Sequence, residues 1–209
     1  MAQFSTEKET NQIGTTAIMK KTLDPTNYKH VSTDPWRWRA ASGPDVPAIV
    51  QLVIDNYTTD VETFLPIHAV ELSRNVMFAI VNQMYNPKKE LISVAVHEAS
   101  EQIVAFTWAQ RDIRNPWSVE EMIAPKMLSI DLRLNTHVRV ALCIQAIIMW
   151  ERWAQVCEIP VINSNTLRKE WTALMRLHTL MGYQVRGSIA FKRLNTINIE
   201  QETGRIILP

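Results

Sequence analysis

The chain has 209 residues, of which 46% are hydrophobic and 21% charged, and its formal net charge is +1. This length suits one substantial domain with an additional arm, and the composition is that of an ordinary globular protein. The near-neutral charge gives no indication of binding to nucleic acid or to a membrane surface.

The N-terminus lacks the apolar core of a secretory signal, and no stretch approaches the ~20 apolar residues of a transmembrane helix. We therefore expect a protein that is not secreted, does not span a membrane and is made in the cytoplasm. Residues 1–35 are polar and rich in turn-forming residues, with no helical or strand period. They form either a flexible leader or an N-terminal arm that becomes ordered on a partner protein.

From residue 36 the sequence alternates between strand and helix patterns. Trp36, Trp38 and Ala40 alternate with arginines, which predicts a strand. Asp45 follows as a candidate N-cap. The predicted apolar face of the first helix consists of Val46, Ile49, Val50, Val53 and Ile54. A second helix is predicted over about 66–85, and its expected buried stripe consists of Val70, Met77, Ile80, Val81 and Met84.

The middle of the chain is rich in β-forming residues. Residues 90–98 and 102–112 predict a hairpin, and residues 113–126 predict a loop with one helical turn at 118–122. Residues 127–134 alternate, which predicts a further strand. Its apolar side is expected to carry Leu128, Ile130, Leu132 and Leu134, and its polar side Ser129, Asp131 and Arg133.

The last third predicts a helix over 138–157, a short strand at 160–164, a helix over 167–181 that ends before Gly182, and a strand over 183–194. The tail 195–209 either adds an edge strand or wraps the surface. The order β-α-α-β-β-β-α-β-α-β predicts an α/β fold with a mixed central sheet flanked by helices.

Cys143 and Cys157 fall in one predicted helix, about 21 Å apart, too far for a disulfide. We expect buried thiols in a reducing compartment. No metal site is expected, because the five histidines show no ligand spacing. They are His30, His68, His97, His137 and His178.

Four stretches in this order resemble the GNAT superfamily of acyl-CoA-dependent N-acetyltransferases, over residues 36–194. "WRWRAASGPDVPAIVQLVIDNY" is similar to the opening strand and helix of that family, and "VAVHEASEQIVAFTWAQ" to its second and third strands, with Ala105 in place of a common glycine. "MLSIDLRLNTHVRVALCIQAI" lies where the family has its fourth strand and CoA pyrophosphate loop, and "LMRLHTLMGYQV" resembles its last helix and the start of the next strand.

The resemblance implies a diphosphate-binding turn in which backbone N–H groups at a helix N-terminus bind the CoA pyrophosphate. The family's turn is rich in glycine, whereas this chain has Thr136, His137, Arg139 and Ala141 at the aligned positions, and only Ala141 conforms. Arg139 either pairs with a phosphate or is a solvated arginine beside a filled groove. The cofactor-contacting residues that the resemblance implies are Leu132, Leu134, His137, Val138, Arg139, Val140, Ala141 and Leu142.

Acyl transfer to an amine needs a general base and a general acid. The resemblance implies Asp131 as the base, and His178 as the acid in place of the family's tyrosine. Two structural alternatives stay open. Asp131 is also placed to pair with Arg133, and His178 recurs with Trp171, Leu174 and Met181 at helical spacing, which predicts a buried histidine.

Three functions are therefore considered. The first is a catalytically degenerate GNAT-fold protein with no cofactor, acting as a structural or assembly component and similar to degenerate GNAT-like proteins of short-tailed bacteriophages. Its partners would be other protein subunits of a virion, bound through the N-terminal arm and through residues 113–122. There Trp117 would either anchor the contact or close one end of the sheet.

The second function is an active acetyl-CoA-dependent N-acetyltransferase with a divergent pyrophosphate loop. The third is a small-molecule or peptide sensor that uses the groove between splayed strands without catalysis.

Overall fold

The computed structural model describes residues 35–61, 66–114, 116–169 and 171–186. Almost all of the predicted N-terminal arm and the whole C-terminal tail lie outside these residues. The sheet has the order β1-β2-β3-β4-β5, in which the first four strands are antiparallel and β5 is parallel to β4. The strands are β1 (Trp36–Ala40), β2 (Glu90–His97), β3 (Ile103–Arg114), β4 (Glu121–Ile130) and β5 (Val161–Ile162).

The helices are α1 (Val46–Asp60), α2 (Ala69–Tyr85), α3 (Thr136–Val156) and α4 (Trp171–Leu180). This element order confirms the prediction as far as α4 and Gly182, whose φ of 91° suits a residue just beyond a helix end. Residues 183–186 form no strand, and the rest of the predicted strand, 187–194, lies outside the described residues.

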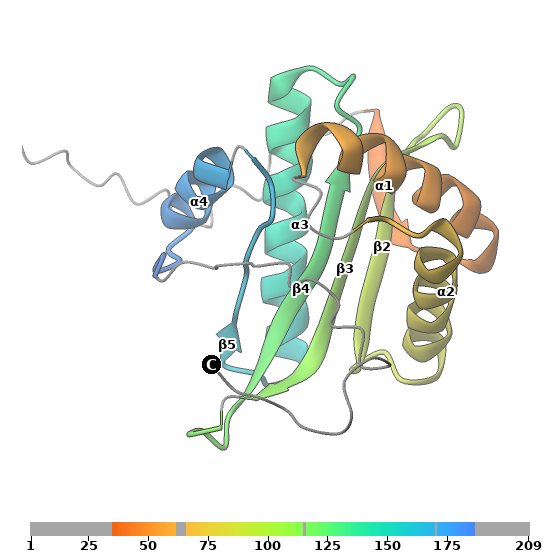
Figure 1. Ribbon diagram of the computed structural model, residues 1–209. Coiled ribbons are helices and arrows are strands. Elements are labelled where there is room, and N and C mark those ends of the chain that lie inside the picture. The colour runs from red at the N-terminus through yellow and green to blue at the C-terminus, as the bar shows by residue number, and fades with distance from the viewer. Residues whose placement is uncertain (1–34, 62–65, 115, 170, 187–209) are drawn as a thin grey trace, which may run out of the picture.

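The sheet separates two hydrophobic cores because alternate strand residues face opposite sides. Ile92, Val94 and Val96 of β2 face α1 and α2, together with Phe106 of β3. Ala95 faces the opposite core, which is built around α3 and also receives side chains of α4. Figure 1 shows α1 and α2 together beside β2, and α4 set apart near α3.

The prediction of a loop over residues 113–126 was wrong. β3 continues to Arg114 and β4 begins at Glu121, so the two strands form one long hairpin that projects from the body of the domain (Figure 1). Trp117 lies at its tip and is 82% exposed, so it does not close an end of the sheet. The preceding polar and proline-containing sequence obscured the strand character of residues 121–126.

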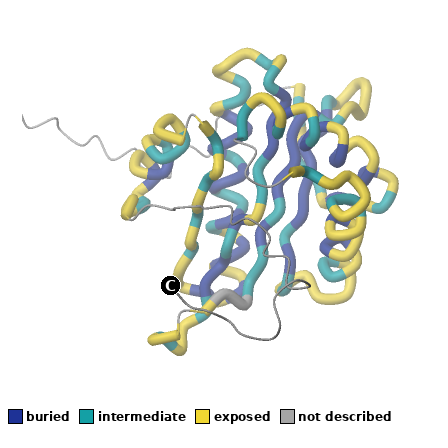
Figure 2. Tube along the Cα trace, in the orientation of Figure 1, coloured by how far each residue is buried: buried dark blue, intermediate teal, exposed yellow. Residues whose placement is uncertain are grey.

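The predicted buried stripe of α2 was also wrong except at Ile80. The helix packs through Val76, Ala79 and Ile80, whereas Val70, Met77, Val81 and Met84 are exposed. Figure 2 accordingly shows the outer side of α2 as exposed. The helix has two apolar sides. The spacing of apolar residues in the sequence pointed to the side that the described fold leaves exposed, rather than to the side that packs on the sheet.

The prediction that the Asp45 side chain caps α1 was wrong. It is buried, and its carboxylate accepts two hydrogen bonds from the Arg39 guanidinium, at 2.7 and 2.8 Å, and two from the amide and hydroxyl of Ser42. The hydrogen bond from Arg39 is the main reason that the pKa of Asp45 falls to about 2. Asp45 therefore ties the end of β1 to the start of α1.

This contact predicts a pH-dependent stability. Because the pKa of Asp45 is lowered on folding, its contribution is complete above the unfolded pKa of about 4 and is lost as the pH falls toward 2. We expect Asp45→Asn to reduce the free energy of unfolding by about 2 kcal/mol at pH 7 and by much less at pH 2.5. Urea titrations across this range test it, with Asp55→Asn on the exposed side of α1 as the control; a difference that does not depend on pH would contradict it.

Candidate functional site

A groove opens where β4 and the chain after β5 separate. The two strands pair at Met122–Val161 and Ile123–Ile162, and the Asn163 N–H donates to the Ile123 carbonyl at 2.8 Å. The next bond of a parallel ladder would come from the amide of residue 125, which is a proline and has no N–H. The strands diverge from this point. We call the space between β4 residues 125–129 and residues 164–168 the β4 groove.

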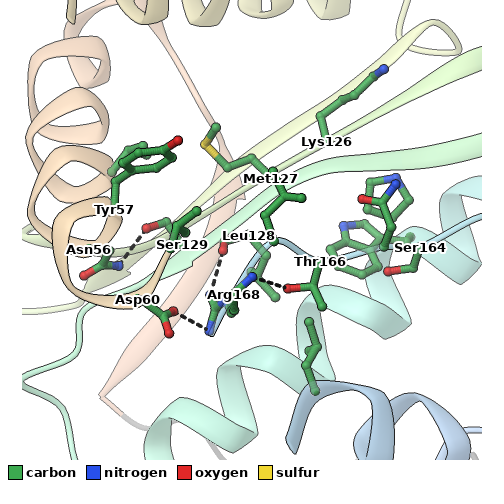
Figure 3. Close-up of a pocket in the computed structure, with 17 residues that line it drawn as sticks. Asn56, Tyr57, Asp60, Lys126, Met127, Leu128, Ser129, Ser164, Thr166 and Arg168 are labelled. Atoms are coloured by element: carbon green, nitrogen blue, oxygen red, sulfur yellow. Dashed lines mark hydrogen bonds and ion pairs between the residues drawn. The ribbon is translucent and has the colours of Figure 1, made fainter. Parts of the chain in front are cut away.

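Arg168 bridges the β4 groove. Its Nη2 donates to the Leu128 carbonyl at 2.8 Å, and its Nη1 lies 3.2 Å from Oδ2 of Asp60 at the end of α1 (Figure 3). The Asp60 carbonyl accepts from the Lys169 N–H at 2.8 Å, so the same segment is fixed twice. Arg168 thus satisfies a β4 carbonyl that the missing strand pairing would leave open.

The wall of the groove on the side of α1 is also closed by internal contacts. The buried Asn56 donates to the Ser129 hydroxyl at 2.7 Å (Figure 3) and to the Ile130 carbonyl at 2.8 Å. The space left is about 170 Å³ and is lined by both polar and apolar side chains, among them Tyr57, Trp150 and Thr166. Pockets for drug-sized ligands have roughly 300–1,000 Å³, so this one suits only a small group.

The start of α3 is the predicted diphosphate turn. Asn135 caps the helix: its Oδ1 accepts from the Val138 N–H at 2.9 Å, and its carbonyl accepts from the Arg139 N–H at 3.1 Å. The Nη2 of Arg139 donates to the Thr136 hydroxyl at 3.3 Å. The Nε of Arg139 is buried without a hydrogen-bond partner among the described residues. The bond of the Arg139 amide is the first regular bond of the helix, whereas the Asn135 side chain engages the Val138 amide, which a diphosphate would need free.

The other predicted cofactor residues are divided between surface and core. His137 and Val140 are exposed, whereas Ala141 and Leu142 are buried in the core beneath α3. Leu132 and Leu134 were predicted to lie in a strand, and this prediction was wrong. β4 ends at Ile130, and residues 131–134 form a turn. The turn follows from the hydrogen bond between the Leu134 N–H and the Asp131 carbonyl at 3.2 Å.

Asp131, the predicted base, lies just after β4 rather than on its polar face. It is buried, and Arg133 binds both carboxylate oxygens, with Nε 2.9 Å from Oδ1 and Nη2 2.8 Å from Oδ2. These hydrogen bonds are the main reason that the pKa of Asp131 is lowered. A carboxylate held ionised in this way is a weaker proton acceptor.

His178, the predicted acid, is buried between α3 and α4. Its Nδ1 donates to the Leu174 carbonyl at 2.9 Å, and its ring meets Tyr183 edge-on with centroids 4.9 Å apart. Burial lowers the pKa of His178, which favours the neutral ring at pH 7. Neither Asp131 nor His178 lines the β4 groove, so the structure does not bring the predicted pair together there.

Other chemistries have little support in the described part of the chain. No group of three His, Cys, Asp or Glu side chains there could hold a metal ion. Cys143 and Cys157 are both unpaired and buried, and burial raises the pKa of Cys143 to about 12, which keeps it a thiol. No described helix is long and apolar enough to cross a bilayer.

Sequence reasoning missed the three residues that define the groove. Pro125 was assigned to a loop, although a proline within a strand is a signal for lost pairing. The residues around Asp60 and Arg168 in the sequence give no sign of their contact, because it joins the end of α1 to a segment far away in the chain. No sequence motif indicates that pair.

The sequence matches no protein-family model and no curated protein. The fold matches many solved structures. AAC(6')-Iy in complex with a bisubstrate analogue shares 13% identity over 77% of this chain and 99% of its own, with a TM-score of 0.55. The aminoglycoside 6'-N-acetyltransferase AAC(6')-Ih of Acinetobacter baumannii shares 12% over 77% and 99% of the two chains, with a TM-score of 0.53.

Glucosamine-6-phosphate N-acetyltransferase of Arabidopsis thaliana shares 10% identity over 76% of this chain and 97% of its own, with a TM-score of 0.53. Each match spans nearly the whole of the enzyme but about three quarters of this chain. The fold is therefore that of the GNAT acetyltransferases, as the sequence resemblance had implied, and these identities show the fold alone.

The bridge across the groove predicts an energetic coupling. We expect Arg168→Ala to reduce the free energy of unfolding by about 1–3 kcal/mol, because it leaves the Asp60 carboxylate and the Leu128 carbonyl without this partner. In a double-mutant cycle with Asp60→Asn, the coupling should lie between about 0.5 and 3 kcal/mol.

The exposed pair Glu71–Arg74 on α2 provides the control, since such pairs contribute about 0.5 kcal/mol or less. Equal coupling in the two cycles would show that Arg168 does not hold the groove.

Proposed function

We propose that this chain is a GNAT-fold protein that has lost acyl-CoA chemistry and serves as a structural or assembly component, in the setting of a bacteriophage virion. The observation that carries the proposal is that polar groups in the β4 groove, just after β4 and at the start of α3 bind each other within the chain. Arg168 binds the Leu128 carbonyl, Asn135 binds the Val138 N–H and Arg133 binds Asp131. A working transferase holds such groups ready for its ligands rather than for its own side chains.

The surface supports the same proposal. Trp117 and Val119 are 82% and 93% exposed at the tip of the β3–β4 hairpin, away from the groove. Large exposed apolar side chains on a projecting loop are typical of protein contacts, and tryptophan is enriched in interface hot spots. We assign this tip and the N-terminal arm, residues 1–35, to binding other subunits of the assembly.

One observation favours a second candidate, an active acetyl-CoA-dependent N-acetyltransferase: the β4 groove itself persists, with a cavity of about 170 Å³ and ionisable side chains at its edge. The lowered pKa values of Asp131 and His178 oppose this candidate, because they leave a weak base and an uncharged imidazole. A sensor of small molecules would use the same cavity and would bind a ligand without turnover.

Calorimetric titration of the full chain with acetyl-CoA separates the first two candidates. We expect no binding with a dissociation constant below ~100 μM, about −5.5 kcal/mol, because the Val138 amide is engaged and the turn lacks glycine. An active acetyltransferase of this fold serves as the positive control. Tighter binding that is lost in Arg139→Ala would establish a diphosphate site and overturn the proposal.

The assembly role predicts a different outcome for the arm. A chain without residues 1–34 should keep nearly the same melting temperature, because the two described cores are built from residues that follow the arm. The same shortened chain should fail to enter the virion particle. Quantitative mass spectrometry of particles purified from cells that express either chain measures the incorporation. Normal incorporation of the shortened chain would rule out the arm as the contact, and Trp117→Ala in the full chain tests the hairpin tip separately.

A further inference from the structure

Helix α4 is held to the domain mainly through a histidine. Within α4, all of whose residues the structure describes, only His178 is buried, with 2% of its surface exposed. Leu174 and Leu177 are half-buried against the core beneath α3, and Met181, just beyond the helix, is buried in it. The docking of α4 therefore depends on few side chains, and the most buried of them can be protonated near neutral pH.

The surroundings of His178 suit its neutral ring. Nδ1 donates to the Leu174 carbonyl, so Nε2 carries the lone pair of the neutral ring, and Nε2 is buried without a hydrogen-bond partner among the described residues. The rings beside it belong to Tyr183 and Trp150, with centroids 4.9 and 6.5 Å away. Protonation would put a charge and a second N–H donor at a place where the described residues offer no acceptor.

His178 also adjoins the wall of the β4 groove. Leu174, whose carbonyl accepts from Nδ1, lines the groove, and so does Trp150, whose ring lies beside the imidazole. Trp150 is fixed to the sheet, because its Nε1 donates to the Thr107 hydroxyl of β3 at 2.9 Å. A movement of α4 would therefore take Leu174 away from the groove and leave Trp150 in place.

We propose that His178 is a pH-sensitive latch: when its ring is protonated, α4 separates from α3 and the β4 groove opens on that side. Burial lowers the pKa of the docked ring, whereas the ring of a separated α4 would regain its ordinary pKa of about 6.5. Docking is therefore favoured at pH 7 and weakens as the pH falls below about 6.5, by up to about tenfold per pH unit. This inference goes beyond the proposed function and does not depend on it.

Other titratable groups near the latch do not produce the same response. They are Glu151 and Cys143 of α3, Arg168 before α4, Arg176 on its exposed side and Tyr183 after it. Burial raises the pKa of Glu151, and a carboxyl group with a raised pKa strengthens docking as the pH falls. Burial and the nearby Glu151 raise the pKa of Tyr183, which stays neutral in this range. Arg168 keeps its charge and is held in an ion pair across the groove.

Amide hydrogen exchange of the full chain between about pH 5 and pH 7.5 tests the release of α4. The reporters are the amides of Met181 and Tyr183, which donate to the carbonyls of Leu177 and His178. After correction for the pH dependence of free amides, the opening of α4 should increase about fivefold or more toward pH 5, whereas the opening of α2 should not. An α4 whose corrected exchange does not change with pH would overturn the proposal.

Two variants and one titration assign the response to His178. His178→Gln cannot be protonated and should make the corrected exchange of α4 independent of pH, whereas His137→Gln, at an exposed histidine, should respond like the wild type. An NMR titration of the wild-type imidazole needs no substitution and should show a pKa below about 6.5. A ring that titrates while the α4 amides stay protected, or a response that survives in His178→Gln, would contradict the latch.

Thiol labelling tests whether the groove opens. Leu174→Cys should react faster with a disulfide reagent as the pH falls, relative to Val156→Cys at an exposed position near the end of α3. The wild-type chain is the background, because Cys143 and Cys157 are buried. The relative rate should become constant when His178→Gln is added. A constant relative rate in the single variant would show that Leu174 does not leave the groove wall.

Discussion

The absent amide hydrogen of Pro125 determines the most distinctive part of this structure. β4 and β5 begin as a parallel pair, and the ladder stops at the position where its next donor would be a proline. From there the chain after β5 leaves the sheet and a groove opens. A central strand with an unpaired edge needs other partners for its carbonyl groups, and Arg168 supplies one by reaching the Leu128 carbonyl from the opposite wall.

Polar groups around the β4 groove, just after β4 and at the start of α3 are bonded to one another. Three independent contacts illustrate this: Arg168 with Asp60, Asn135 with the Val138 amide, and Arg133 with Asp131. Each contact satisfies a charge or a backbone group within the chain. Large exposed apolar side chains lie on the outer side of α2 and at the hairpin tip, and Leu167 is exposed at the β4 groove itself.

The sequence was sufficient for much of the fold, for identifiable reasons. α3 and the β2–β3 hairpin have long, regular patterns, and both were predicted within a few residues. The β3–β4 hairpin was missed because Pro125 and the polar segment before β4 hide a strand whose pairing depends on its neighbours. The buried side of α2 was misassigned because a helix with two apolar sides offers periodicity no way to choose between them.

The candidate site was less accessible to sequence reasoning. The missing glycines at His137 and Arg139 were visible in the sequence, and so was the option that Asp131 pairs with Arg133. The bridge between Asp60 and Arg168 was not visible, because it depends on where two distant segments meet.

The Asp60–Arg168 bridge also constrains how the sequence can change over time. A substitution that removes either residue alone strands a charge in a half-buried place, whereas removing both together does not. The two positions are therefore coupled: a single substitution at either one passes through a less stable protein, so we expect Asp60 and Arg168 to change together.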